Sequence, residues 1–315
     1  MSVAVVIAAY NAENSIERAI DSVLCQTRRP SEIIVVNDAS IDNTLAVVEA
    51  LSHVFGEIRI ISLDRNSGPS CARNAAIRST KTDWIAILDA DDAWKPERLE
   101  RLLDAAEKQP TDFVADNFIY FDVVAGVESG FGFDPSSARR LISIEDVISS
   151  DIIGYSSFVL GLLQPIMRRE FLTKNRIFYN EKTQLAEDTE LLIDSLIAGA
   201  KVLLLPEPYY IYSTPIGHFS KKPSPHQRTK LRLDVMAENN RLLEKKYAGL
   251  ISPRSLWLLR KRGRQLMARH HAIAASQYKR SGKLFRYAIH HFRHPELIAL
   301  KAAIWKERVA SLFQR

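Results

Sequence analysis

Residues 84–94 read WIAILDADDAW, and this stretch decides the fold. Its short apolar run, residues 84–88, predicts a buried strand. The strand ends at three carboxylates, Asp89, Asp91 and Asp92, which repel one another unless a cation is present. Mg²⁺ and Mn²⁺ bind such oxygens and complete their coordination with phosphates and water. The stretch therefore predicts a metal site at a strand end, although Asp92 alone fits equally well as the N-cap of a helix over residues 93–105.

Three apolar runs precede this strand, at residues 3–8, 32–37 and 58–62. Between them, residues 15–26 and 43–51 carry apolar side chains at helical spacing. This alternation is typical of a mostly parallel, Rossmann-like sheet with helices on both faces. Polar residues follow each run, namely Tyr10-Asn11, Asn37-Asp38, Arg65-Asn66 and the aspartates. Because open α/β sheets bind ligands at the carboxyl ends of their strands, these residues are expected to line one crevice.

Length and composition are those of a globular protein, with 315 residues, 46% of them hydrophobic and 25% charged. The first residues include an apolar run but neither a basic leader nor a small-residue cleavage site, and no apolar window is long enough to span a membrane. These features predict a cytoplasmic protein. Cys25 and Cys71 lack metal-ligand spacing, so we expect them to be reduced thiols.

The net charge of +6 divides unevenly along the chain. Residues 221–315 contain 23 Lys and Arg against 5 Asp and Glu, whereas residues 1–220 contain 20 against 32. The acidic part suits a divalent metal and the basic part suits phosphates or an anionic membrane surface. We therefore expect a catalytic domain over residues 1–220 and a basic helical region over residues 221–315.

The second half of the chain gives weaker signals. Residues 129–156 are rich in Gly, Ser and Phe and are expected to be irregular, with a helical piece at 144–149. A helix is expected over 186–198, a strand over 201–205 and a short extended piece over 209–213. The later helices expected from the pattern cover residues 231–247, 255–281 and 295–313.

Five motifs occur in order along the chain: VIAAYNAENSIERAIDSVLCQT (6–27), EIIVVNDASIDNT (32–44), RNSGPSCARNAAI (65–77), LDADD (88–92) and AEDTELL (186–192). Their order and spacing resemble those of the family 2 glycosyltransferases over roughly residues 1–220. Within that family the chain is most similar to bacterial exopolysaccharide enzymes, including those that extend succinoglycan-like repeat units. The resemblance implies a GT-A fold and inverting transfer of glucose or another hexose from a UDP-sugar.

The resemblance also implies a donor site. Ala8 and Tyr10, at the end of the first strand, would hold the base, with the Tyr10 ring stacked on uracil. Asp38 would accept the pyrimidine N–H, which favours uracil over cytosine. Arg73 would reach the base or the diphosphate with its planar fork. From the residues alone, Tyr10 also fits a half-buried core position and Asp38 a turn.

The same resemblance implies that Asp89 binds ribose, with Ala90 beside it in the donor site, and that Asp91 binds Mn²⁺ or Mg²⁺. His218 lies in a later loop, where it would be a further metal ligand or a diphosphate contact. The simpler interpretation of His218 is an exposed loop residue. Asp42, in the second motif, is expected to cap the following helix.

The AEDTELL motif resembles the family's paired carboxylates, of which one is the catalytic base. That comparison favours Asp188, with Glu187 beside it. A sugar hydroxyl is a poor nucleophile until a positioned carboxylate takes its proton, so such a base is needed. Acidic residues are also favoured in a first helical turn by the helix dipole, which is a sufficient reason for Glu187.

The partners remain open at this level. The acceptor implied by the resemblance is a glycan or a polyprenyl-diphosphate-linked saccharide. The basic amphipathic stretch LLRKRGRQLMARHH (258–271) fits docking on the inner membrane surface or packing in a helical bundle, and nucleic-acid binding is not expected because aromatic interleaving and a known motif are lacking. A metal-dependent nucleotidyltransferase is the alternative function.

Overall fold

The computed structural model describes residues 1–156, 158–183, 185–214 and 232–312. It contains two compact units. The first comprises Met1–Ser143 and Leu162–Ser224, and the second comprises Ile144–Gly161 and Pro225–Arg315. The sequence suggested a single boundary near residue 220, whereas in the structure a segment from the middle of the chain joins the later helices. This segment, Ile144–Gly161, has only 18 residues, and its sequence pattern does not indicate which unit it packs against.

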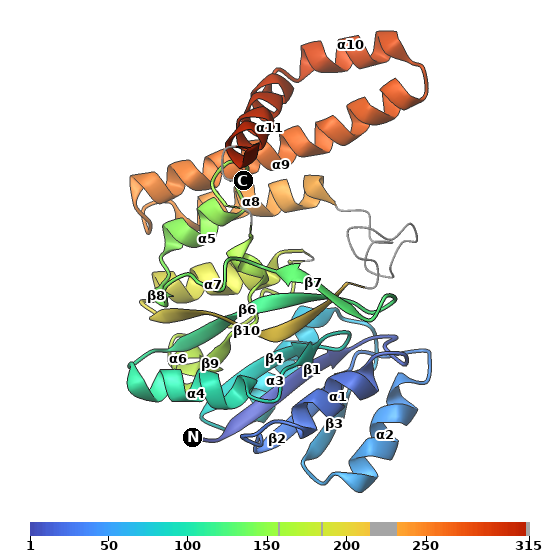
Figure 1. Ribbon diagram of the computed structural model, residues 1–315, viewed down its shortest axis with the longest axis vertical. Coiled ribbons are helices and arrows are strands. Elements are labelled where there is room, and N and C mark those ends of the chain that lie inside the picture. The colour runs from blue at the N-terminus through green and yellow to red at the C-terminus, as the bar shows by residue number, and fades with distance from the viewer. Residues whose placement is uncertain (157, 184, 215–231, 313–315) are drawn as a thin grey trace. The chain divides into compact units, whose positions relative to one another are not determined.

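The first unit begins with alternating strands and helices: β1 (Val3–Ala9), α1 (Ile16–Leu24), β2 (Glu32–Asn37), α2 (Thr44–Val54), β3 (Ile58–Ser62), α3 (Pro69–Ser79) and β4 (Trp84–Asp89). The four strands predicted here are confirmed. The chain steps across the sheet from β1 to β3 and then turns back to β4. Right-handed crossovers therefore put α1 and α2 on one face and α3 on the other (Figure 1).

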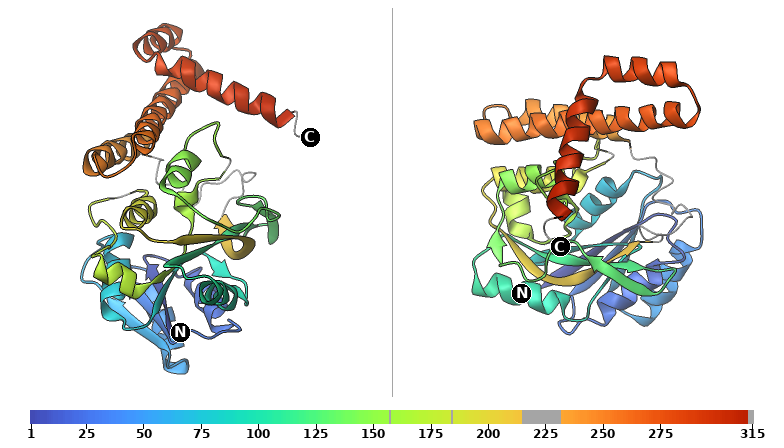
Figure 2. Two further views of the ribbon diagram at one scale, coloured as in Figure 1. Left: turned by 90° about the vertical axis from the view of Figure 1, so that its left-hand side faces the viewer. Right: turned by 45° about the horizontal axis from the view of Figure 1, so that its top comes forward.

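In the described part of the chain, ten strands form one sheet in the order β3-β2-β1-β4-β9-β6-β10-β5, with β7 paired to β6 and β8 to β10. The β1–β2, β2–β3, β1–β4 and β6–β10 pairs are parallel, and β9 and β5 are antiparallel to their neighbours. The sheet is therefore mixed and mostly parallel in its first half, as expected. Figure 2 shows it from two further directions.

The later elements of this unit are β5 (Ala93–Trp94), α4 (Arg98–Lys108), β6 (Phe113–Asp122), β7 (Val127–Phe131), β8 (Arg140–Leu141), β9 (Ile166–Arg168), α6 (Arg169–Lys174), α7 (Glu187–Ile197) and β10 (Val202–Thr214). The two pieces expected at 201–205 and 209–213 are one strand, β10. Its pairing with β6 continues past Pro208 through register shifts, which the sequence pattern could not reveal. The region expected to be irregular contains two short strands.

The core of the first unit lies around β1 and β4. All five residues of the apolar run at 84–88 are fully buried. Such continuous burial on both faces is the usual state of a central strand in a parallel sheet. In register, Ala8 lies opposite Asp89, and Ala9 lies opposite Asn37. The carboxyl ends of β1, β2 and β4 are therefore level with one another.

The second unit is helical, with α5 (Ile144–Ser150), the 3-10 turn Leu160–Leu162 at its edge, α8 (Leu233–Tyr247), α9 (Pro253–Arg280), α10 (Leu284–Arg293) and α11 (Glu296–Leu312). α5, α8, α10 and α11 all contact α9 (Figure 1). The pattern predicted α5, α8, α9 and α11 but missed α10. None of the helices in the described ranges has both the length and the apolar character to cross a bilayer.

Candidate active site

The residues that follow β1, β2 and β4 meet at one edge of the sheet. Tyr10 comes directly after β1 and is half-exposed, Asp38 follows β2 and is buried, and Asp89 is the last residue of β4. The level strand ends place these residues at the same edge of the sheet. Ala8, which lies opposite Asp89 in the sheet, is half-buried at the same edge.

Asp38 fixes the loop that leads into α3. Its two carboxylate oxygens each accept a backbone hydrogen bond at 2.8 Å, one from the N–H of Ser67 and one from that of Gly68. Gly68 has a φ of 86°, a conformation that glycine adopts at little cost, and Pro69 begins the helix after it. Asp38 therefore sets where α3 begins, and with it the position of Arg73 one turn later.

Arg73 is the centre of the site. Its guanidinium donates to Asp89 at 2.7 Å, to Asp188 at 3.0 Å and to Glu187 at 3.3 Å, and the side chain is only 5% exposed. The guanidinium also lies 5.1 Å from the ring centre of Tyr179. Burial works against the charged form, but Asp188 and Asp89 outweigh it and raise the pKa of Arg73 well above its ordinary value.

One arginine thus joins the two acidic motifs, which are 99 positions apart from Asp89 to Asp188. The sequence suggested that Arg73 reaches the base or the diphosphate, whereas here its fork spans carboxylates from β4 and α7. Its ε N–H is buried and has no hydrogen-bond partner among the described residues. Removal of this arginine would leave three carboxylates facing one another.

Asp188 has the electrostatics of a proton acceptor. Burial raises its pKa to about 7, against the opposing effect of Arg73, and the charge of Glu187 adds to the rise. A hydrogen bond with Tyr179 acts in the lowering direction. The side chain nevertheless keeps 20% of its surface exposed. A carboxylate that titrates near neutral pH and can still be reached is suited to general base catalysis.

Asp92 differs from the prediction that it caps a helix. Helix α4 begins four residues beyond β5, at Arg98, with Glu97 at the N-cap position. The Asp92 carboxylate is buried and accepts from the Tyr210 hydroxyl at 2.8 Å and from the Ser213 N–H at 2.7 Å. The following residues pair with β10 as β5, which turns Asp92 into the sheet. Asp92 therefore anchors β10 to the aspartate turn.

Asp42 was expected to cap α2, and it lies one position before the N-cap residue of that helix. The residue in the N-cap position of α2 is Asn43, yet the Asp42 carboxylate accepts from the backbone N–H of Thr44 at 3.0 Å. Hydrogen bonds from Thr44 and from Glu13 lower the pKa of Asp42 although burial works in the raising direction. Asp42 therefore accepts a hydrogen bond from the first turn of the helix, although it is not the N-cap residue.

The aspartate turn concentrates negative charge. Burial raises the pKa of Asp92 well above its usual range, and the nearby charges of Asp91 and Asp89 raise it further. Asp89 accepts from Arg73 and from the Gln164 amide at 3.2 Å, and Asp91 lies half-buried two residues on. The backbone carbonyl of Asp91 accepts from Arg18, which fixes the turn. Asp91 therefore fits a hard cation, which would relieve the repulsion that the Asp92 pKa reveals.

Strained backbone conformations flank the candidate residues. Asn11, Ala39 and Ala186 have φ values of 51°, 56° and 65°, which non-glycine residues seldom adopt. Asn11 follows Tyr10, Ala39 follows Asp38, and Ala186 precedes Glu187. Such strain persists only where the surrounding structure enforces it, and it concentrates at functional sites.

Two candidates from the sequence contribute differently. Ala90 is buried in the aspartate turn, without a polar side chain of its own. His218 lies outside the described residues. Conversely, Gln164, Tyr179 and Arg18 contact site residues but were not singled out. Gln164 and Tyr179 lie in segments without a motif, so only the folded chain brings them to Asp89 and Asp188.

Comparison with known proteins agrees with this geometry. Residues 4–131 match the model of glycosyl transferase family 2. The chain belongs to this family. The succinoglycan biosynthesis protein ExoO of Rhizobium meliloti (strain 1021) is 36% identical over 219 residues, which cover 69% of this chain and 62% of ExoO. This family 2 chain therefore matches less than two thirds of that relative's length.

Solved structures with the same fold are similar to this family 2 chain at low sequence identity. S. aureus TarS 1-349 in complex with UDP-GlcNAc has a TM-score of 0.64 at 19% identity, with coverage of 85% of this chain and 71% of TarS. GalNAc-T7 with UDP, GalNAc and Mn²⁺ has a TM-score of 0.54 at 18% identity, with coverage of 71% and 45%. The GT-A fold expected from the motifs is confirmed.

Proposed function

We propose that this protein is an inverting glycosyltransferase that moves a hexose from a UDP-sugar to a hydroxyl group of a growing polysaccharide. The observation that carries the proposal is that the Arg73 guanidinium forms ion pairs with both Asp188 and Asp89. The proposed proton acceptor, Asp188, and the proposed donor-site residue, Asp89, are therefore both in contact with one arginine. The match to ExoO, a succinoglycan biosynthesis protein, supports an exopolysaccharide as the product.

Asp188 is the catalytic base in this mechanism. As the acceptor oxygen bonds to the anomeric carbon, the bond from that carbon to the diphosphate oxygen breaks, and the hydroxyl proton passes to the Asp188 carboxylate. A single displacement of this kind inverts the anomeric centre. The Asp188 pKa of about 7 suits a base that is partly ionised at neutral pH and can still accept a proton. Glu187 supports this role by raising that pKa.

In this proposal the donor is held by residues from the first four motifs. Each oxygen of Asp38 accepts one backbone N–H, and because a carboxylate offers about four acceptor positions, capacity remains for the imide N–H of uracil. Tyr10 is exposed enough for its ring to stack on the base, beside Ala8. Asp89 and Ala90 would lie next to the ribose. Arg73 acts by positioning the carboxylates.

Asp91 would hold Mn²⁺ or Mg²⁺. Such a cation would offset the negative charge that develops on the departing diphosphate. Asp92 fits this role less well because it is buried and holds β10, whereas Asp91 is only half-buried. The presence of Mn²⁺ with UDP in the similar GalNAc-T7 structure supports this choice of ion.

A donor panel tests the proposal. Purified protein is incubated with UDP-, GDP- and TDP-sugars, with Mn²⁺, Mg²⁺ or EDTA, and the released nucleotide is measured. We expect UDP release that requires metal and is lost in Asp91→Ala. The matched control is Asp21→Ala, the same change at an exposed position of α1. Full activity of Asp91→Ala in EDTA would refute the metal role, and release of pyrophosphate would indicate a nucleotidyltransferase instead.

The acceptor we propose is a polyprenyl-diphosphate-linked saccharide at the inner membrane surface. The surface that would contact the membrane is α10, where Phe285 is 79% exposed and Phe292 is 89% exposed, with Leu284 beside them. Arg286 and Arg293 flank this apolar strip on the same helix. Apolar side chains bordered by cations are the features with which a helix binds an anionic leaflet.

Residues 258–271, which suggested membrane docking in the sequence, do not present an apolar face to solvent. Leu258, Leu259 and Leu266 of α9 are buried inside the second unit, so their apolar face is not available to lipid. This outcome corresponds to the bundle interpretation for residues 258–271. The membrane proposal therefore moves to α10, which the sequence pattern did not identify as a helix.

Vesicle flotation of the full chain tests the surface. We expect binding to vesicles that contain phosphatidylserine, weaker binding at higher salt, and loss of binding in the Phe285→Ser, Phe292→Ser double variant. Val54→Ser, the loss of an exposed apolar side chain on α2, is the matched control. Equal binding by the double variant would refute α10 as the contact and would leave the transferase proposal unaffected.

A further inference from the structure

Helix α10 has too little buried surface to hold it in place. It is 10 residues long, and none of its described side chains is buried, with Tyr287 and His290 the half-buried ones. Isolated helices shorter than about 12 residues are marginal in water, and helices in proteins gain most of their stability by burying an apolar face. The apolar face of α10 is exposed instead. Another interaction must therefore fix this helix against α9.

Three histidines meet where α10 lies against α9. The candidate ligand atoms of His271, on α9, and of His290 and His294, at the end of α10, all lie within 4.8 Å of one another. His290 and His294 are four positions apart, which places them on one side of the helix. That side also includes Tyr287 and is turned away from Phe285 and Phe292. The half-buried face of α10 is therefore an imidazole face.

A carboxylate completes the cluster. Oε1 of Glu296, in the first turn of α11, lies 3.2 Å from Nδ1 of His294 and 4.0 Å from Nε2 of His271. Three imidazole nitrogens and one carboxylate oxygen are drawn from α9, α10 and α11, the three helices that end the described chain. Packing several imidazoles together gives little apolar burial, so the arrangement is poorly explained as a core.

We propose that His271, His290, His294 and Glu296 form a zinc site that ties α10 and α11 to α9. Zn²⁺ favours four ligands, and nitrogen from histidine with oxygen from a carboxylate is among its usual ligand sets. The candidate histidine ligand atoms lie within 4.8 Å of one another, and binding an ion would draw them closer together. The binding free energy of the metal would stabilise an end of the chain that has little core of its own.

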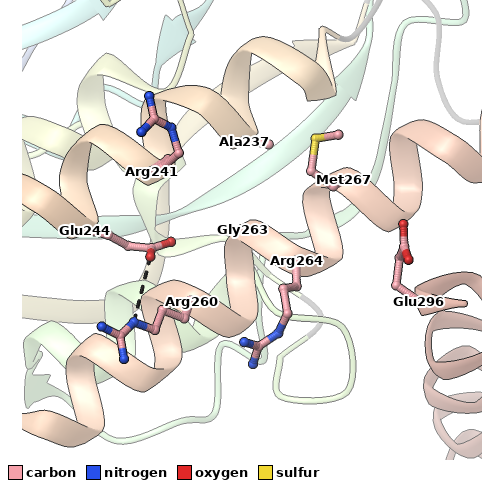
Figure 3. Close-up of a pocket in the computed structure, with 8 residues that line it drawn as sticks. All are labelled: Ala237, Arg241, Glu244, Arg260, Gly263, Arg264, Met267 and Glu296. Atoms are coloured by element: carbon pink, nitrogen blue, oxygen red, sulfur yellow. Dashed lines mark ion pairs between the residues drawn. The ribbon is translucent and has the colours of Figure 1, made fainter. Parts of the chain in front are cut away.

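Solvent access also favours this site. Glu296 lines a cavity of about 400 Å³, between α8 and α9 in the second unit (Figure 3). Arg241, Arg260 and Arg264 line the same cavity. Glu296 is therefore reachable from solvent, and its side chain is 34% exposed.

Metal titration of the untagged, EDTA-treated full chain tests the proposal. We expect one equivalent of Zn²⁺ to bind by calorimetry, and Co²⁺ in its place to give the visible absorption of a four-coordinate ion. His290→Ala and His294→Ala should each weaken binding by at least about 10-fold, the loss that even an outer-shell partner causes. His53→Ala, at an exposed position of α2, should leave it unchanged.

Trypsin provides a second measurement that does not depend on the variants. Zn²⁺ should slow cleavage after Arg286 and Arg293 in the wild-type chain, because a fixed helix is a poor protease substrate. Asp91→Ala should retain the zinc equivalent, which separates this site from the aspartate turn. A wild-type chain that binds no tight equivalent, unweakened binding in both histidine variants, or loss of the equivalent in Asp91→Ala would each overturn the proposal. The first two of these results leave the transferase proposal unaffected.

Discussion

The first unit contains two arginines that are buried against carboxylates, whereas most charged side chains in the second unit lie on helix surfaces. Arg73 and Arg98 are at most 5% exposed and contact carboxylates of the same unit. In the second unit the ion pairs of Arg232 and Arg241 are more than half-exposed on the arginine side. Arg262, buried against Asp151, is an exception.

The difference shows what burial does to charge. In the first unit, burial raises the pKa of Asp188 to about 7, against the opposing effect of Arg73 and with a further rise from Glu187. In the second unit, most cations are exposed to solvent and act together as a surface. We therefore expect substitutions in the first unit to change chemistry and stability, and exposed substitutions in the second to change contacts with other molecules.

The largest effect is expected for Asp188→Asn. Loss of a general base typically costs 10² to 10⁴ in rate, so kcat should fall by about that factor. UDP binding should persist, since this carboxylate acts on the acceptor. Asp194→Asn makes the same change in the same helix and should leave kcat near the wild-type value. Calorimetry that shows UDP binding lost together with transfer would assign Asp188 to the donor site instead.

The buried ion pair behind the site is the next test. Arg98 donates to Asp116 at 2.8 Å, with the two side chains 0% and 1% exposed. Arg98→Met would leave Asp116 buried without its partner, which costs about 3–5 kcal/mol in the free energy of unfolding. Arg29→Met breaks an exposed pair with Glu57 and should cost at most about 1 kcal/mol. Equal losses in urea denaturation would contradict the contrast between buried and exposed charge.

The pH dependence of the rate provides a third measurement. Because Asp188 must be ionised to accept a proton, kcat/KM should fall about tenfold per unit below a pKa of about 7. The effect on stability has the opposite sign. The folded-state pKa of Asp188 lies above the ordinary value of 3.8. Protonated Asp188 therefore stabilises the folded state fully below pH 3.8, and this stabilisation is lost as pH rises to about 7. A kcat/KM profile that is flat from pH 5 to pH 8 would exclude Asp188 as the base.

The smallest effect is expected on the surface of α10. Phe285→Ser and Phe292→Ser remove side chains that are already exposed, so each should change the free energy of unfolding by at most about 0.5 kcal/mol. Leu266→Ala, in the buried face of α9, should cost about 2–5 kcal/mol. If the phenylalanine variants are as unstable as the leucine variant, α10 packs against another part of the protein.

Short-range pattern was enough for the first half of the fold. The apolar runs that became β1 to β4 are continuous and bounded by polar turns, and they were predicted to within one residue. The long strand β10 was divided in two because Pro206 and Pro208 lie inside it, and its pairing with β6, which continues past them, comes from elsewhere in the chain. α10 was missed although its apolar residues have helical spacing.

The sequence by itself determined the family, the α/β order and the candidate carboxylates, because these depend on periodicity and on motifs with close spacing. Only the tertiary structure decided what the carboxylates do to one another. It placed Arg73 between Asp89 and Asp188, turned Asp92 into the sheet to hold β10, and gathered His271 with His290 and His294. These are long-range contacts, and burial sets their strength, which no local pattern records.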